Sequence, residues 1–433
     1  MPSASLLLVA ALLLGAAAGR DPDQFSDDYP RALERARERR VPILVDVWAP
    51  WCPPCRYMQG FVLRDPALAG LTRRVVRLEV NTELPANAPF VEKYPIDAWP
   101  SLLVLDPWSE RVVLRWVGSA TAKEVDRLSR DGARALLRAE TGRADAAYGR
   151  AEGLYAERRH AEAAAAYGEA LFASGDSWPR RRLAAEKRVQ ALSFARDPAA
   201  CAQGALEAAA MLGPSPRARV AATGLSCAAT IADEALRREA IDALEPLARA
   251  SLSGSGLTPD DRSGLYEALV EARDALGDGT GSRTVALRWL AFLEEAASKA
   301  PTPLARSAFD SARSEAATRV GEPSRALPAL LASAKDLPDD FAPQSSLAVL
   351  YLALSRPKDA LDACERALSL LGGPRRVRVL VIRAQAEEAL GERKDARETL
   401  EEAVRLGEAY PEALRPHAPL REAKRLLASL GEG

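Results

Sequence analysis

The feature that most constrains the fold is a change in the hydrophobic pattern near residue 134. Before it, short apolar runs that predict strands alternate with amphipathic stretches that predict helices. The predicted strands are 43–48, 75–80, 101–105 and 112–117, and the predicted helices are 29–40, 52–63, 88–93 and 122–130. After residue 134, strand signals vanish and apolar residues recur with the period of a helix. The chain therefore divides into an α/β domain, with a mixed sheet flanked by helices, and an all-α region.

The all-α region repeats itself. Ala360 lies 34 residues after Ala326, and Ala396 follows 36 residues later, each in a similar helical segment. Further small or apolar residues fall in the same frame: Leu330, Cys364, Ala367, Leu400, Ala403, Ala163, Tyr167 and Ala170. Small residues at such positions let antiparallel helices approach closely, and stacked pairs then share one core.

This region resembles tetratricopeptide (TPR) repeats. The resemblance is clear over 144–179 and 310–411 and degenerate over 180–300. It implies an all-α TPR-like solenoid with a groove that binds a peptide or protein partner. An array of another helical type, and a purely spacer or scaffold role, are the alternatives. Clusters of Gly, Pro and Ser punctuate the helices, and the stretch 251–264 predicts the longest loop.

The N-terminus has the pattern of an export signal. Residues 6–14 form an apolar core, and Ala16 to Ala18 offer a small-residue cleavage site. No Lys or Arg precedes the core, so an uncleaved anchor or a misassigned start is the alternative. No later segment is apolar for long enough to cross a membrane. We therefore expect a signal peptide at 1–19 and a periplasmic or otherwise exported protein, in an oxidising compartment.

Composition excludes several classes of function. The 59 basic and 60 acidic residues leave no net positive charge that would attract nucleic acid. The two histidines, His160 and His417, lie far in sequence from the motif described below, which argues against a histidine triad or a multi-histidine metal site. No phosphate-binding loop or dinucleotide fingerprint is present. We expect no metal and no cofactor.

The sharpest motif is Cys52-Pro-Pro-Cys55. It follows the predicted buried strand 43–48 directly and begins a predicted helix. Free N–H groups and the positive end of the helix dipole lower the pKa of a thiol at that place. Two intervening residues bring the second thiol close enough to form a disulfide. Half a zinc site is the competing interpretation, but no second C-x-x-C exists.

Two other features accompany the motif. Asp46 lies in the middle of the apolar strand, where burial raises the pKa of a carboxyl group, and it is placed to exchange a proton with Cys55. A structural buried acid is the alternative. Pro100 directly precedes the strand 101–105, which suggests a cis bond in a tight turn. The backbone of Trp99 would then lie beside Cys52 and be free to pair with an extended substrate.

At this point the segment 45–56, VDVWAPWCPPCR, resembles the active-site segment of thioredoxins, and 93–105 resembles their cis-proline segment. The resemblance covers about 25–131. It implies a thioredoxin fold with Cys52 as nucleophile, Cys55 as resolving thiol, Asp46 as buried proton acceptor and Pro100 as the cis-proline. The residues expected to contact the substrate are Trp51, Pro53, Pro54, Trp99 and Pro100.

The stretch 58–71 also resembles the C-terminal thioredoxin-like domain of the DsbD reductases, which favours a reductant or an electron relay. Unlike those proteins, this chain has no membrane domain to supply electrons. Two departures from thioredoxins stand out. Pro53-Pro54 replaces the commoner Gly-Pro, so Pro53 offers no N–H near the Cys52 sulfur. Arg77 stands where thioredoxins have a lysine near the buried acid.

The remaining cysteines lie on predicted helices. Cys201 and Cys227 are 26 residues apart, a spacing that leaves open whether neighbouring helices bring them together. Cys364 occupies a repeat position and is expected to be a small buried residue.

The sequence thus predicts an exported thiol–disulfide oxidoreductase that acts on protein thiols and disulfides. Its expected parts are a signal peptide (1–19), a thioredoxin-like domain (25–131), a degenerate helical-repeat region (134–300) and TPR-like repeats (301–430). The alternatives are a TPR scaffold with a thioredoxin-like binding module, and a redox-gated scaffold in which both parts matter.

Overall fold

The computed structural model describes residues 21–137, 142–254 and 256–431. The expected signal peptide at 1–19 lies outside the described residues. Within those ranges, none of the helices is both long enough and apolar enough to span a bilayer.

A five-stranded mixed sheet forms the centre of the N-terminal domain. Its strands are β1 (Gln24–Ser26), β2 (Ile43–Trp48), β3 (Val76–Asn81), β4 (Ser101–Leu105) and β5 (Val112–Val117). They lie in the order β1-β3-β2-β4-β5. Strands β1, β3 and β2 are parallel to one another, and β4 runs antiparallel to both of its neighbours, β2 and β5. The predicted mixed sheet is confirmed. The edge strand β1 was not predicted because its three residues are too short to show a period.

Helices cover both faces of the sheet. They are α1 (Tyr29–Arg39), α2 (Pro53–Gly60), α3 (Ala88–Lys93) and α4 (Ala122–Leu137). Helices α1 and α3 pack on the face that carries Val45 and Val47. Helices α2 and α4 pack on the other face, which carries Leu44. The alternation of side chains along β2 therefore serves two cores, and explains why 43–48 reads as a nearly continuous apolar run.

All described residues after 142 that are in regular structure are helical. The α-helices of this described part are α5 (Arg143–Ala156), α6 (His160–Ala173), α7 (Arg181–Phe194), α8 (Pro198–Ala209), α9 (Pro214–Ala229), α10 (Glu234–Leu252), α11 (Pro259–Ala275), α12 (Gly279–Ser298), α13 (Pro303–Ser307), α14 (Asp310–Arg319), α15 (Leu327–Asp336), α16 (Phe341–Ala353), α17 (Pro357–Leu370), α18 (Arg376–Ala389), α19 (Arg393–Ala409) and α20 (His417–Gly431). We call this region the array. It has the predicted TPR-like arrangement, because helices pack on the next helix in sequence, as α5 does on α6 and α16 on α17, or on the next but one, as α9 does on α11.

The small residues of the repeat are buried where helices meet. Ala326, Ala360 and Ala403 have no exposed surface, and Ala396 is 1% exposed. The free thiol of Cys364 is buried as expected. Cys201 on α8 and Cys227 on α9 form a disulfide, which settles the pairing that the sequence left open.

The predicted loop at 251–264 is wrong over its second half. Helix α10 continues to Leu252, and α11 already begins at Pro259. The side chain of Thr258 accepts a hydrogen bond from the Asp261 N–H at 3.0 Å, so Thr258 caps the helix. Pro at the first helical position and acidic residues in the first turn complete a strong helix start. These signals outweigh the Gly and Ser content of the segment.

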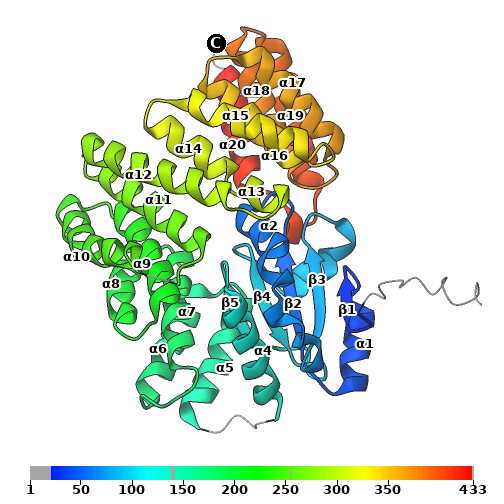
Figure 1. The fold of residues 1–433 in the computed structure, drawn as a ribbon, viewed down its shortest axis with the longest axis vertical. Helices are drawn as coiled ribbons and strands as arrows, with labels where there is room; N and C mark the ends of the chain where they lie inside the picture. The colour runs from blue at the N-terminus through cyan, green and yellow to red at the C-terminus, as the bar shows by residue number, and fades with distance from the viewer. Residues whose placement is uncertain (1–20, 138–141, 255, 432–433) are drawn as a thin grey trace, which may run out of the picture.

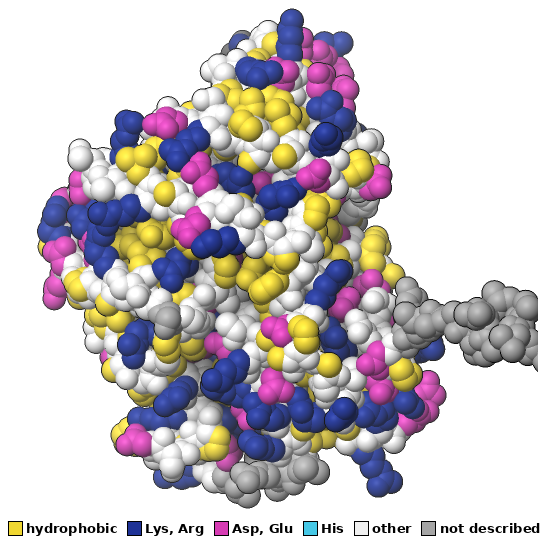
Figure 2. Space-filling model, viewed as in Figure 1, with side chains coloured by type: hydrophobic (Ala, Val, Ile, Leu, Met, Phe, Trp, Pro, Cys, Tyr) yellow, Lys and Arg dark blue, Asp and Glu magenta, His cyan; other side chains and the backbone are white. Residues whose placement is uncertain are grey.

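Figure 1 shows the array as an arc around the N-terminal domain. It begins where α5 packs beside β5 and passes α2, where α13 lies against that helix. The array therefore lies against the same helix that carries Cys55. On the face of the molecule in Figure 2, acidic, basic and hydrophobic side chains are interspersed.

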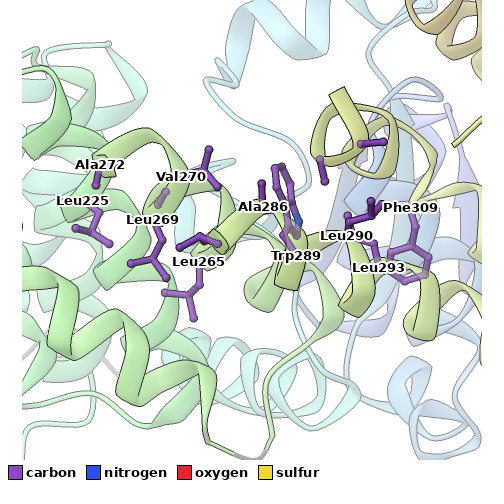
Figure 3. Close-up of a cluster of buried hydrophobic side chains, with 14 of the residues drawn as sticks. Leu225, Leu265, Leu269, Val270, Ala272, Ala286, Trp289, Leu290, Leu293 and Phe309 are labelled. Atoms are coloured by element: carbon purple, nitrogen blue, oxygen red, sulfur yellow. The ribbon is translucent and has the colours of Figure 1, made fainter. Parts of the chain in front are cut away.

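One large hydrophobic cluster runs through the middle of the array. Figure 3 shows part of it, with Leu225 and Ala272 at one end of the view and Leu293 and Phe309 at the other. Trp51, directly before Cys52, and Tyr57, two residues after Cys55, pack against this cluster. The core of the array is thus continuous with the surroundings of the cysteine motif.

Candidate functional site

The cysteine motif lies where β2 ends and α2 begins. Cys52 is the N-cap of α2 and Pro53 its first residue. The Cys55 N–H points to the Cys52 sulfur at 3.1 Å, and the two cysteines form a disulfide. A helix N-terminus stabilises a thiolate through its free N–H groups and its dipole. Although Pro53 contributes no N–H, the Cys55 N–H is available to the sulfur of Cys52.

Asp46 lies on β2 with 5% of its surface exposed. Neither of its carboxylate oxygens has a hydrogen-bond partner among the described residues. Burial raises the pKa of Asp46 to about 7 and the charge of Glu79 adds to this, while the nearby side chains of Gln59 and Arg77 oppose it. A carboxyl group with that pKa both accepts and releases a proton near neutral pH, as the buried acid of a dithiol site must.

Trp99 and Pro100 are joined by a cis peptide bond, as the sequence suggested. The carbonyl of Pro100 accepts a hydrogen bond from the Gly118 N–H at 2.9 Å. The Trp99 indole donates to Thr82 Oγ1 at 3.0 Å and meets the Trp51 ring edge to face at 5.2 Å. The cis-proline turn and the cysteine motif are thereby held together by two tryptophans.

The array contacts the residue before Cys52. The Trp51 indole donates to the Glu83 carboxylate at 2.7 Å, and the same carboxylate accepts the Arg375 N–H at 2.9 Å. The Arg375 guanidinium lies 4.8 Å from the centre of the Trp51 ring, a cation–π contact. Glu83 therefore links Trp51 to the start of α18.

The array also contacts the residue after Cys55. Arg56 is 5% exposed and forms an ion pair with Asp340 at 2.5 Å. It donates to Ser307 Oγ at 2.7 Å and to the Pro50 carbonyl at 3.2 Å. Both flanks of the motif are thus fixed by residues 250 or more positions away in sequence. Sequence reasoning missed all of these partners, because no local pattern marks them.

A cleft of about 520 Å³ opens between the N-terminal domain and the array. From the domain it is lined by Pro53, Pro54, Tyr57, Ala98, Val117 and Gly118. From the array it is lined chiefly by residues of α7, α9, α11, α12 and α14, including Asp260, Gly264, Glu267, Trp289 and Phe309. We call it the interdomain cleft.

The predicted site residues fall into two groups around this cleft. Pro53 and Pro54 line it. Trp51 and Trp99 pack around the cysteines instead, with Cys52 only 2% exposed. Within the described residues, no group of three or more His, Cys, Asp or Glu side chains is arranged to hold a metal ion.

Sequence comparisons with known proteins match the N-terminal domain. Residues 29–133 match the family model described as a thioredoxin-like domain. The thiol:disulfide interchange protein DsbD 1 of Pseudomonas aeruginosa is 29% identical over 99 residues, which are 22% of this chain and 17% of that protein. Thioredoxin 1 of Synechococcus elongatus is 36% identical over 67 residues, 16% of this chain and 59% of that protein.

The chain thus spans about a sixth of that DsbD protein and less than two thirds of that thioredoxin. Among solved structures, the TPR2AB-domain:pHSP90 complex of yeast Sti1 aligns with 66% of this chain and across 98% of its own chain at 16% identity, with a TM-score of 0.26. A score this low does not establish a shared fold. The comparisons therefore identify residues 29–133 as a thioredoxin-like domain.

Proposed function

We propose that this protein is an exported thiol–disulfide oxidoreductase in which Cys52 and Cys55 exchange with disulfides of other proteins. The observation that carries the proposal is the dithiol pair at the start of α2, together with the unpartnered buried carboxyl group of Asp46. Resemblance to the DsbD proteins favours reduction of the substrate as the direction.

The reaction balances without a cofactor. The Cys52 thiolate attacks one sulfur of a substrate disulfide, a mixed disulfide forms, and the other substrate sulfur leaves as a thiolate. Cys55 loses its proton to Asp46 and attacks the Cys52 sulfur. The second substrate thiolate is released and takes up a proton. Two electrons pass to the substrate, and the Cys52–Cys55 disulfide then needs a dithiol donor from outside the chain.

The array supplies the second wall of the interdomain cleft in this proposal. A substrate bound between Pro53 or Pro54 and the array would have its disulfide held near Cys52, which raises the effective concentration of the reacting sulfur. Export would place the protein in a compartment where protein disulfides form.

Insulin reduction tests the proposed reaction. With dithiothreitol as donor, the protein should accelerate the precipitation of reduced insulin, and Cys52→Ser should abolish the acceleration. Cys364→Ser, which alters a buried thiol far along the chain, is the matched control and should retain activity. Cys55→Ser should accumulate mixed disulfides with substrates, because the resolving thiol is missing. An unaccelerated reaction with the parent protein would contradict the proposal.

One observation favours a second candidate, a redox-gated scaffold. The residues on either side of the cysteine pair, Trp51 and Arg56, both contact the array. In this candidate, reduction of the disulfide moves Trp51 and Arg56, and their contacts transmit the movement to the array, which then binds its partner differently. Partner capture from a periplasmic extract by the oxidised and the reduced protein distinguishes the two, since an enzyme needs no such difference.

A further inference from the structure

The array wall of the interdomain cleft includes one continuous face of α11. Asp260, Ser263, Gly264 and Glu267 all line the cleft, and their spacing places them on one side of that helix. A Cβ atom added at Gly264 would meet nothing within 4 Å. The middle of this face is therefore open, with one carboxylate on either side of it.

The opposite wall offers an edge to an extended chain. It is formed by Pro53, Pro54, Ala98 and Gly118, next to the cis-proline turn. Among the described residues, the peptide N–H and C=O of Trp99 make no hydrogen bond. Free backbone groups at such an edge pair with an extended segment, which can add there like a strand. The volume of about 520 Å³ suits a few residues of such a segment rather than a folded domain.

Acidic side chains outnumber basic ones in the lining of the cleft. Arg219, the basic side chain that lines it, is bound by Glu186 at 2.8 Å and by Asp261 at 3.4 Å. Within the described part of the chain, Asp260 and Glu267 have no ion pair with a basic side chain. Since carboxylates without a counter-charge in a concave site attract cations, the cleft favours a positively charged occupant.

Asp260 is fixed in place by the N-terminal domain. The Ser119 hydroxyl donates to its carboxylate at 2.7 Å, and Ser119 directly follows Gly118 of the opposite wall. Burial raises the pKa of Asp260 to about 6, and the charge of Asp261 adds to this. The group is still mainly ionised at neutral pH, and a cation bound beside it would relieve the cost of its burial.

We propose that the interdomain cleft selects, among protein disulfides, an extended segment with a lysine or arginine close to its cysteine. Asp260 and Glu267 are the residues that determine this specificity. The inference rests on the proposed function, because the cysteine of that segment supplies the sulfur that Cys52 attacks. It adds to that function a substrate class that the array, and not the cysteine motif, selects.

Three synthetic peptides test the proposal with the reduced full-length protein. They are identical except that lysine, alanine or glutamate flanks a central cysteine, and each carries that cysteine as a mixed disulfide with mercaptoethanol. The second-order rate constant of exchange is measured by stopped-flow tryptophan fluorescence at low salt. We expect the lysine peptide to react at least about tenfold faster than the glutamate peptide, as for other charge-steered encounters.

The variants separate the cleft from the intrinsic reactivity of the peptides. Asp260→Asn with Glu267→Gln should reduce the lysine-to-glutamate ratio to about a third or less of the parent value, because the charge of Asp260 is removed together with that of Glu267, which is partial at neutral pH since burial raises its pKa to about 7. Glu239→Gln on α10, an exposed glutamate that does not line the cleft, should leave the ratio unchanged. An equal ratio in the parent and the double variant would overturn the proposed specificity. If the parent reacted with none of the three peptides, the proposed function itself would fail.

Discussion

Replacement of Asp46 by Asn should raise the free energy of unfolding above that of the parent, and this gain should be larger at pH 8 than at pH 4.5. The pKa of Asp46 rises from an ordinary 3.8 to about 7 in the folded protein. The folded state therefore holds the proton more tightly than the unfolded state. The stability that goes with the protonated acid is complete below pH 3.8 and is lost as the pH rises through 7.

The expected magnitude follows from this gap of about three pKa units. At about 1.36 kcal/mol for each unit, the parent has lost up to about 4 kcal/mol of this stability at pH 8, but only about 1 kcal/mol at pH 4.5, where Asp46 is still protonated in the folded state. Asn has nearly the shape of the protonated acid and removes the titration. The variant should exceed the parent by those amounts.

Urea unfolding of the oxidised proteins, followed by tryptophan fluorescence at both pH values, measures the difference. Asp339→Asn is the matched control, because Asp339 is exposed, and it should show little change at either pH. An offset between the Asp46 variant and the parent that is the same at both pH values would refute the reasoning. So would a variant that is less stable than the parent at pH 8.

Two further predictions concern the array. Replacing Cys201 and Cys227 with Ala removes a disulfide that closes a loop with a sequence separation of 26, which should lower stability by about 3 kcal/mol; calorimetry that found no fall in the unfolding temperature would contradict this. In a double-mutant cycle with Arg56→Met and Asp340→Asn, we expect a coupling energy of about 1–3 kcal/mol, less than for a fully buried pair because Asp340 is 20% exposed. Additive effects in urea unfolding would show that the contact does not join the two parts energetically.

Local signals in the sequence sufficed for the N-terminal domain. The apolar run around Asp46, the spacing of Cys52 and Cys55, and the proline before a strand each determine their structure over a few residues. The four longer strands and the cis bond at Pro100 were predicted for that reason.

The array wall of the site could not be predicted in the same way. Glu83 and Arg375 meet across 292 positions, and neither residue stands out in its own segment. The face of α11 was hidden because Gly and Ser near residue 260 resemble a loop, although Thr258 caps a helix there. Contacts of this kind depend on how the array curves around the domain, and single-sequence periodicity does not contain that curvature.

The central claim is that Cys52 and Cys55 form a reversible redox pair in the intact protein. A variant with Cys201 and Cys227 replaced by Ala leaves this pair as the one disulfide that can titrate among the described cysteines. Equilibration against a dithiothreitol series, read by thiol alkylation, should give one two-electron transition near the thioredoxin value of about −270 mV. A value near about −120 mV would mark an oxidant and contradict the proposed direction. A disulfide that cannot be reduced and re-formed reversibly would contradict the account as a whole.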